Sequence, residues 1–267
     1  MHTVPGGGGL AATVDVEHGA RITGLVSGGR EWLAPSLPLP AGAPRAFVHA
    51  GTGGWDDAIP TVAACVLADG KSLPDHGDVW DLRWEVVEAS VESLLVRVAL
   101  TSLPIELERR ISPTRDGLRI DWTASTEFPV PVSFLWSAHP LFVAEPGSRM
   151  VAPGALVEEY PGRGPVEWPE SIDSIEDGRA LKAFAPSGGI ASIVQTDGSA
   201  LTLTWDPAVL PHLGLYWDRG EFSTRPVMAI EPTMAPTDSA ARAEALWTIT
   251  AGEPRRWWVE VRPGVPT

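Results

Sequence analysis

The chain has 267 residues, enough for one large domain or two small ones. Its 34 acidic residues against 20 Lys and Arg give a net charge of −14, which disfavours nucleic acids and anionic membranes as partners. Cys65 is the single cysteine, so an internal disulfide and a cysteine-based zinc site are excluded. No apolar run reaches the roughly 20 residues of a membrane span, and the first residues lack the pattern of a signal peptide. We therefore expect a cytoplasmic protein.

Alternation of apolar and polar residues predicts short strands along most of the chain. Asp116-Gly117 lies between two of these strands and predicts a tight hairpin. No segment has the apolar stripe of an amphipathic helix, so the sequence predicts an all-β sandwich or barrel. The predicted strands cover 12–17, 21–26, 84–89, 96–101, 104–112, 118–125, 131–136, 190–195, 200–205, 213–217, 226–231, 242–250 and 256–262.

Residues 145–187 are rich in Pro and Gly, and we expect them to form a long excursion over the surface of a single domain spanning 1–267. Trp makes up 12 of the 20 aromatic residues (with 6 Phe and 2 Tyr), which points either to a β core or to flat surfaces for sugar rings. Core packing is the expected role for most of them.

Four short clusters could carry chemistry. Trp55, Asp56 and Asp57 are expected in a glycine-rich loop that suits a polyhydroxyl ligand, because carboxylates accept hydrogen bonds from hydroxyl groups while an indole covers C–H groups. The alternative is a solvated turn whose Trp packs inward. Asp75 and His76 form a second cluster, in which the acid can hold the His in one orientation.

His139 follows an apolar strand that contains Trp136, and at a strand end it could act as a general acid. A His in the core, bonded to the backbone, is the alternative. Glu231 also closes an apolar strand, where partial desolvation raises the basicity of a carboxylate. Trp217 and Asp218 end the strand that precedes it.

The order of these clusters resembles the aldose 1-epimerase (galactose mutarotase-like) family over residues 10–260. Each motif is short, and the ordered set carries the resemblance. The matching motifs are Gly19-Ala20-Arg21-Ile22 with Gly29-Arg30-Glu31-Trp32-Leu33, Gly53-Gly54-Trp55 to Pro60, Asp75-His76-Gly77 with Trp84-Glu85-Val86, His139-Pro140-Leu141-Phe142, Leu210 to Trp217, and Glu231-Pro232 with Asp238.

This resemblance implies a galactose mutarotase-like β-supersandwich that binds a sugar on a concave sheet face, without a cofactor. No metal is expected, and a metal site formed by Asp75, His76 and Asp78 is an alternative with little support in the sequence. The resemblance assigns Glu231 as the general base for the anomeric hydroxyl and His139 as the general acid for the ring oxygen. His76 is implied to bind near the ring oxygen and C1. Substrate-binding roles are expected for Trp55, Asp56, Asp57, Asp75, Trp136, Trp217 and Asp218.

The sequence departs from the family at two points. Members that act on sugar 6-phosphates tend to carry an Arg shortly after the His-Gly pair, where this chain has Trp80, so a neutral sugar is favoured. Arg21 and Arg83 leave an acidic sugar open. The family's acidic sugar-binding residue has no clear match; Asp218 is the first choice, with Asp56 and Asp57 as competitors.

The sequence thus predicts an aldose 1-epimerase that interconverts the anomers of a free sugar by general acid/base ring opening. Two alternatives stay open: a carbohydrate-binding or regulatory protein without turnover, and another isomerase, lyase or hydrolase on the same scaffold. A small-molecule sugar is the expected ligand, and a homodimer is one expected assembly because sandwich edges often pair.

Overall fold

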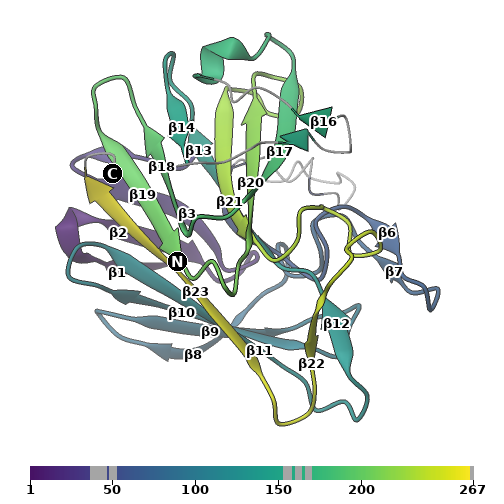
Figure 1. Cartoon of the computed structure of the whole chain (residues 1–267). Coiled ribbons are helices and arrows are strands. Elements are labelled where there is room, and N and C mark those ends of the chain that lie inside the picture. The colour runs from purple at the N-terminus through teal and green to yellow at the C-terminus, as the bar shows by residue number, and fades with distance from the viewer. Residues whose placement is uncertain (37–46, 48–52, 153–157, 160–163, 166–169, 265–267) are drawn as a thin grey trace.

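The computed structural model describes the chain except for residues 37–46, 48–52, 153–157, 160–163, 166–169 and 265–267 (Figure 1). The described residues form antiparallel β structure, with short 3-10 helices at η1 (Gly7–Gly9) and η3 (Ile172–Ser174). The predicted all-β class is confirmed. None of the described helices is long and apolar enough to cross a membrane.

The larger sheet brings together strands from all parts of the chain. Its central strands β5, β13 and β21 are neighbours although more than 75 residues separate each from the next in sequence. In spatial order the described strands are β1 (His2–Pro5), β2 (Ala11–Asp15), β3 (Arg21–Ser27), β5 (Gly54–Ala58), β13 (Ser137–Val143), β21 (Val227–Thr233), β20 (His212–Asp218), β17 (Ala180–Pro186), β15 (Glu158–Glu159) and β16 (Gly164–Pro165), with β4 (Arg30–Glu31) paired to β3.

A second sheet packs against the first, and two small strand pairs complete the described fold. The order in the second sheet is β14 (Arg149–Val151), β18 (Ile190–Val194), β19 (Ala200–Trp205), β23 (Arg255–Gly264), β11 (Leu118–Ser125), β10 (Glu106–Pro113), β9 (Leu94–Ala99) and β8 (Glu85–Ala89). The small pairs are β12 (Val132–Phe134) with β22 (Trp247–Ile249), and β6 (Cys65–Val66) with β7 (Ser72–Leu73).

The core lies between the two sheets and follows from the period-two patterns. Every second residue of β11 is buried, including Ile120 and Trp122, and its partner strand β10 is joined to it by the predicted Asp-Gly hairpin. Trp122 packs against Trp136 of the other layer, with ring centroids 4.9 Å apart. Each fully buried large side chain contributes roughly 1.5–3 kcal/mol. The predicted core role is confirmed for Trp32, Trp55, Trp80, Trp84, Trp122, Trp136, Trp205, Trp217, Trp247 and Trp257, which are all buried.

Several strand predictions were wrong in ways that matter for the site. The segment expected to be a glycine-rich loop around Trp55 is the buried central strand β5. His139 lies inside β13 rather than at the end of a strand, because the chain breaks at Leu135 and Trp136 and a new strand begins at Ser137. The expected strand 242–250 shortens to Trp247–Ile249.

The segment 145–187 also holds regular structure. Its last part, Ala180–Pro186, is strand β17 of the larger sheet. The sequence gives little sign of this strand, since it has no β-branched residue and ends in Pro. Its alternation is nevertheless real, because Ala183 and Ala185 are fully buried while Lys182 lies on the opposite face.

A buried ion pair joins the two sheets inside the core. Arg109 of β10 donates from Nη1 to Asp57 Oδ2 at 2.8 Å, and both side chains are completely buried. Trp136 Nε1 donates to the other carboxylate oxygen of Asp57 at 3.2 Å, and the Arg109 guanidinium also donates to the carbonyl oxygen of Ala20. The charge of each partner is therefore compensated by the other in a site without water access.

We predict that Asp57→Asn destabilises the protein by about 3–5 kcal/mol, because it leaves the Arg109 charge buried without its counter-ion. Urea denaturation followed by Trp fluorescence measures the free energy of unfolding. Asp116→Asn, in the exposed Asp-Gly turn, is the matched control and should change it little. A decrease in the free energy of unfolding below about 1 kcal/mol for Asp57→Asn would show that the charges of Asp57 and Arg109 do not stabilise the fold.

Candidate active site

A row of side chains crosses the outer face of the larger sheet from strand to strand. His139 on β13 is paired with Asp56 on β5, and Glu231 on β21 is paired with Gly214 on β20. The pairs Ser137↔Thr233 and Phe142↔Met228 fix the register between β13 and β21. Counting inward from either pair places His139 opposite Glu231. Residues separated by more than 170 positions thus meet on one face.

Gly214 continues this row to the next strand, where it is paired with Phe184 of β17. Lys182 lies two residues before Phe184 and so shares its face. The absence of a side chain at Gly214 lets groups approach one another over β20, because a Cβ there would lie 3.0 Å from Glu231 Oε2.

A cavity of about 350 Å³ lies over this row. Its wall surface is mainly apolar, and several polar side chains converge on it, which is typical of a small-molecule site. The lining residues are Phe47, Val62, Ala63, Asp75, His76, His139, Leu141, Lys182, Tyr216, Phe222, Glu231 and Asp238.

The carboxylate of Glu231 and the imidazole of His139 face each other at the base of the cavity. His139 Nε2 lies 3.9 Å from Glu231 Oε1. Both residues are buried, and neither Glu231 Oε1 nor His139 Nδ1 has a hydrogen-bond partner. Buried polar atoms are paired in most proteins, so unpaired atoms on two neighbouring side chains mark a place where a ligand can supply the missing bonds.

Burial shifts the pKa values of Glu231 and His139 in opposite directions. Desolvation raises the pKa of Glu231, against the opposing effect of the Lys182 ammonium. Desolvation lowers the pKa of His139 well below its ordinary value, and the positive charges of His76, Lys182 and Arg21 lower it further. A pair of groups with such shifts, in one cavity, is suited to proton transfer.

His76 forms the part of the cavity wall next to His139. It follows hairpin β6–β7, and its ring stacks on Phe47 with centroids 3.8 Å apart and meets His139 edge-on at 4.9 Å. Asp75 Oδ2 lies 3.0 Å from His76 Nδ1, without hydrogen-bond geometry. Gly77 (φ 72°) must lack a side chain, because a Cβ would lie 1.9 Å from the carbonyl oxygen of Ile59. His76 itself has a φ of 56°, an uncommon value for a non-glycine residue.

The structure therefore brings together His76, His139, Glu231 and Asp75 of the predicted site residues. Asp56 lies next to them in the same row but not on the cavity wall, and both its oxygens face Arg21, with distances of 2.9 Å. Desolvation raises the pKa of Asp56, and the Arg21 charge opposes this shift. Asp56 is thus a neighbour of the cavity, and its charge is matched by Arg21.

The other predicted binding residues do not line the cavity. Trp55 and Asp57 flank Asp56 on β5 and so point into the core, where Trp136 and Trp217 are also completely buried. Asp218 turns back onto its own loop. Its carboxylate accepts the backbone N–H groups of Gly220, Glu221, Phe222 and Ser223 at 2.8–3.1 Å and the hydroxyl of Tyr216 at 3.1 Å.

The cavity also contains residues that the sequence did not single out as site residues. Lys182 is the main one, and Asp238 was noted only as part of a motif. Phe47, Tyr216 and Phe222 add an aromatic wall. One signal for Lys182 was available: Lys71 and Lys182 are the only lysines in the sequence, and a rare cation alternating with apolar residues is unusual.

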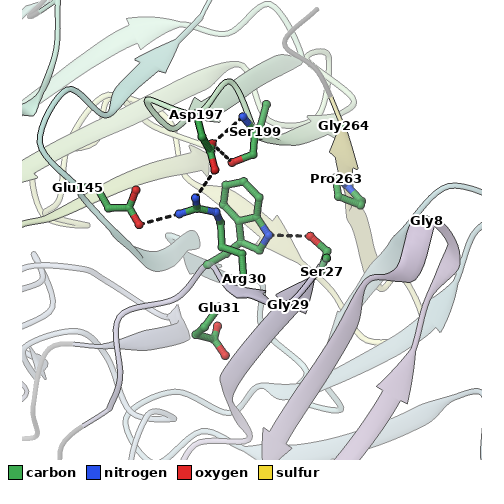
Figure 2. Close-up of a pocket in the computed structure, with 13 residues that line it drawn as sticks. Gly8, Ser27, Gly29, Arg30, Glu31, Glu145, Asp197, Ser199, Pro263 and Gly264 are labelled. Atoms are coloured by element: carbon green, nitrogen blue, oxygen red, sulfur yellow. Dashed lines mark hydrogen bonds and ion pairs between the residues drawn. The ribbon is translucent and has the colours of Figure 1, made fainter.

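A larger hollow of about 740 Å³ lies elsewhere, between η1, β3–β4 and the turn after β18 (Figure 2). Arg30 projects into it, but its guanidinium is bound by Glu145 at 2.7 Å and Asp197 at 2.6 Å. The Trp32 indole donates to Ser27. Because these polar groups satisfy one another, the hollow lacks the unpaired atoms of the smaller cavity.

No group of three or more His, Cys, Asp or Glu residues in the described part of the chain is placed to hold a metal ion. Asp78, which follows His76 by two residues, accepts the backbone N–H groups of Thr101 and Ser102 and the Ser102 hydroxyl instead.

Comparison with known proteins identifies the fold. No family model matches the sequence, and no curated protein matches it. Solved structures match over almost the whole chain. They include the Slr1438 protein from Synechocystis sp. PCC 6803 (TM-score 0.80, 17% identity, 97% of this chain and 93% of that one), a galactose mutarotase-like protein from Lactobacillus casei (0.72, 17%, 99% and 100%) and an aldose epimerase homologue from C. elegans (0.71, 16%, 99% and 98%).

These matches define the class of protein: the chain has the galactose mutarotase-like fold, as the sequence resemblance predicted. Identities of 16–17% in these matches establish the fold alone. The activity must be argued from the residues of the cavity.

We predict that Asp218→Ala lowers the free energy of unfolding by about 3 kcal/mol, because four backbone N–H groups lose a charged acceptor. Asp206→Ala is the control, since Asp206 accepts the backbone N–H of Ala208 in another turn, and should cost about 1 kcal/mol. Thermal unfolding measures both. Unchanged stability with loss of sugar binding would contradict this role and favour direct ligand contact by Asp218.

Proposed function

We propose that the protein is an aldose 1-epimerase that interconverts the α and β anomers of a free, non-phosphorylated sugar. The observation that supports this most is the placement of Glu231 Oε1, which has no hydrogen-bond partner, 3.9 Å from His139 Nε2 in a cavity with a mainly apolar wall. The shared fold with a galactose mutarotase-like protein supports the same reading.

Ring opening needs one proton to leave the anomeric hydroxyl O1 and one to reach the ring oxygen O5. Glu231 takes the proton from O1 as a carboxylate, and C1=O1 forms as the C1–O5 bond breaks. The electron pair of that bond goes to O5, which receives a proton from the His139 imidazolium. Rotation about C1–C2 and closure on the other carbonyl face, with the proton transfers reversed, give the other anomer.

A role for His76 near O5 and C1 is supported by its ring, which meets His139 edge-on and lines the same cavity. The aromatic residues Phe47, Tyr216 and Phe222 offer flat surfaces for the C–H face of a pyranose. Asp75 and Asp238 are acceptors for sugar hydroxyls.

A neutral sugar is favoured by the charges at the cavity. Among the described residues, Lys182 contacts Glu231 and Asp238, and Arg21 contacts Asp56, so the nearby cations are already matched by carboxylates. A phosphate would have to compete with these pairs. The cytoplasmic location and the homodimer stay predictions from the sequence.

We predict that Glu231→Gln lowers kcat/KM for anomer exchange by about 10²–10⁴-fold while sugar binding persists, because the amide keeps the shape of the side chain but cannot take a proton. Saturation-transfer NMR with neutral, acidic and phosphorylated aldoses measures exchange, and quenching of Trp fluorescence measures binding. Glu92→Gln, on an exposed turn, is the control.

Three results would contradict the proposal. Full exchange activity in Glu231→Gln would remove the assigned base. Binding of a sugar without faster anomer exchange would favour the carbohydrate-binding alternative. A new product, rather than a changed rate of exchange, would favour another isomerase, lyase or hydrolase.

The pKa shifts predict an acidic optimum. The pKa of His139 is lowered, so its imidazolium form is lost as pH rises through a value well below 6.5. The pKa of Glu231 is raised, so its carboxylate is lost as pH falls through a value above 4.5. Enzyme-catalysed mutarotation, corrected for the spontaneous rate, should therefore peak on the acid side of neutrality. A plateau extending to pH 8 or above would contradict a proton-donating His139 imidazolium.

A further inference from the structure

Lys182 is a partly buried cation that the acid/base scheme above does not use. It lines the cavity, and its ammonium contacts Glu231 Oε2 directly, with Asp238 Oδ1 at 3.4 Å. Its side chain is 13% exposed. Removing a lysine ammonium from water costs free energy unless its charge is paired. Here the ammonium has two carboxylate partners.

The fold directs Lys182 specifically to Glu231. Lys182 stands on β17 and Glu231 on β21, with β20 between them. Gly214 is the residue of β20 opposite Glu231, and a Cβ there would come within 3.0 Å of Glu231 Oε2 and 3.2 Å of Glu231 Cβ. Glu231 Oε2 thus lies over Gly214, where β20 carries no side chain, and meets the ammonium of Lys182, whose own partner residue on β20 is Tyr216.

This contact leaves the two oxygens of Glu231 in different states. Oε2 is held by Lys182, whereas Oε1 has no hydrogen-bond partner and faces His139 Nε2 at 3.9 Å. A carboxylate fixed through one oxygen cannot rotate freely, so its other oxygen keeps a defined direction. A general base needs this property, because its basic atom must be aligned with the proton it removes.

Asp238 anchors the lysine to the loop that carries the second histidine. The carbonyl oxygen of Asp238 accepts the backbone N–H groups of Val62 and Ala63 at 2.9 and 2.6 Å. The carbonyl oxygen of Val62 in turn accepts the backbone N–H of His76 at 2.6 Å. Lys182 is thus linked through Asp238 and Val62 to the segment that carries His76.

We propose that Lys182 is a positioning residue that keeps Glu231 ionised in its buried site and directs the free oxygen Oε1 toward His139 and the substrate. This inference rests on the proposed function for its kinetic consequences. The claim that Lys182 keeps Glu231 ionised concerns the protein alone, so it can be tested without a substrate.

The charge balance around Glu231 supports this role. Burial favours the protonated form of Glu231, and the nearby Asp238 carboxylate favours it too, whereas the Lys182 ammonium opposes both. Burial also works against the charge of Lys182, but Asp238 and Glu231 outweigh it and raise the pKa of Lys182 above its ordinary value, so the ammonium persists at neutral pH. The ionisable groups that face Glu231 are His76 before β8, His139 on β13, Lys182 on β17, Tyr216 on β20 and Asp238 after β21.

The test compares Lys182→Met with Lys182→Arg and with Lys71→Met, which removes the other, exposed lysine. Met keeps the length and apolar stem of Lys without its charge, and Arg restores the charge. Infrared spectroscopy of protein labelled with [¹³C]glutamate detects the C=O stretch of a protonated Glu. Glu231→Gln identifies which band belongs to Glu231.

We expect a protonated Glu231 band at pH 7 in Lys182→Met and none in wild type, Lys182→Arg or Lys71→Met. In turnover, the acid limb of the pH profile should move to higher pH in Lys182→Met. Each unit by which the pKa of Glu231 exceeds the pH removes about tenfold of its carboxylate, so kcat should fall at least about tenfold at pH 7 with a smaller change in KM. Lys182→Arg should recover part of the rate.

An ionised Glu231 in Lys182→Met at pH 7, together with an unshifted acid limb, would overturn the inference. Near-UV circular dichroism of the Trp-rich core shows whether each variant is folded. If Lys182→Met does not fold, Lys182→Gln, which is polar but uncharged, replaces it in the same infrared measurement: a protonated Glu231 at pH 7 supports the inference, and an ionised Glu231 overturns it. If wild type shows no anomer exchange, the proposed function fails while the infrared result still tests the lysine.

Discussion

The site depends on strand register across the larger sheet. Asp56, His139, Glu231 and Gly214 form one transverse row on β5, β13, β21 and β20, and each belongs to a different stretch of the chain. Because side chains alternate between faces, a slip of one residue in any of these strands would exchange a cavity residue for a core residue. The hydrophobic core fixes the register: Trp55 and Asp57, on either side of Asp56, are completely buried on the inner face. Packing of the sandwich therefore positions the catalytic candidates.

The second determinant is the low polarity of the cavity. Desolvation raises the pKa of Glu231 and lowers that of His139, so burial works against the charged form of each group. Lys182 has opposite effects on the two charged forms that the reaction needs. Its positive charge favours the Glu231 carboxylate and disfavours the His139 imidazolium. The arrangement thus favours the base over the acid at neutral pH, which is the origin of the expected acidic optimum.

Much of this could be predicted from the sequence. Period-two patterns identified most strands of the second sheet, such as Leu118–Ser125, and the ordered motifs identified His76, His139 and Glu231, which the structure places in one cavity. The central strands of the larger sheet were harder to predict, because both of their faces are buried. In β5 polar and apolar residues are buried alike, because Asp57 pairs with Arg109 in the core, so alternation could not distinguish its faces. The same difficulty concealed Ala180–Pro186, and with it Lys182, whose partners are known only once β17 is placed beside β20.

The roles of the acidic residues also required the structure. Asp56, Asp57 and Asp218 looked alike in sequence as acids beside a Trp. In the fold they lie in three environments: an ion pair with Arg21 beside the cavity, an ion pair in the core, and a set of backbone N–H groups in a loop. Only the partners, which are distant in sequence or lie in the backbone, separate these roles.

The central claim is that the transverse row binds a sugar with its anomeric centre between Glu231 and His139. A crystal structure of Glu231→Gln with an aldose that exchanges in the wild-type protein would test it most directly. The account predicts that the anomeric oxygen lies within about 2.6–3.2 Å of the residue 231 side chain and the ring oxygen within the same distance of His139 Nε2. A sugar bound in the hollow beside Arg30, or bound over the row with its anomeric carbon turned away from both residues, would contradict the account.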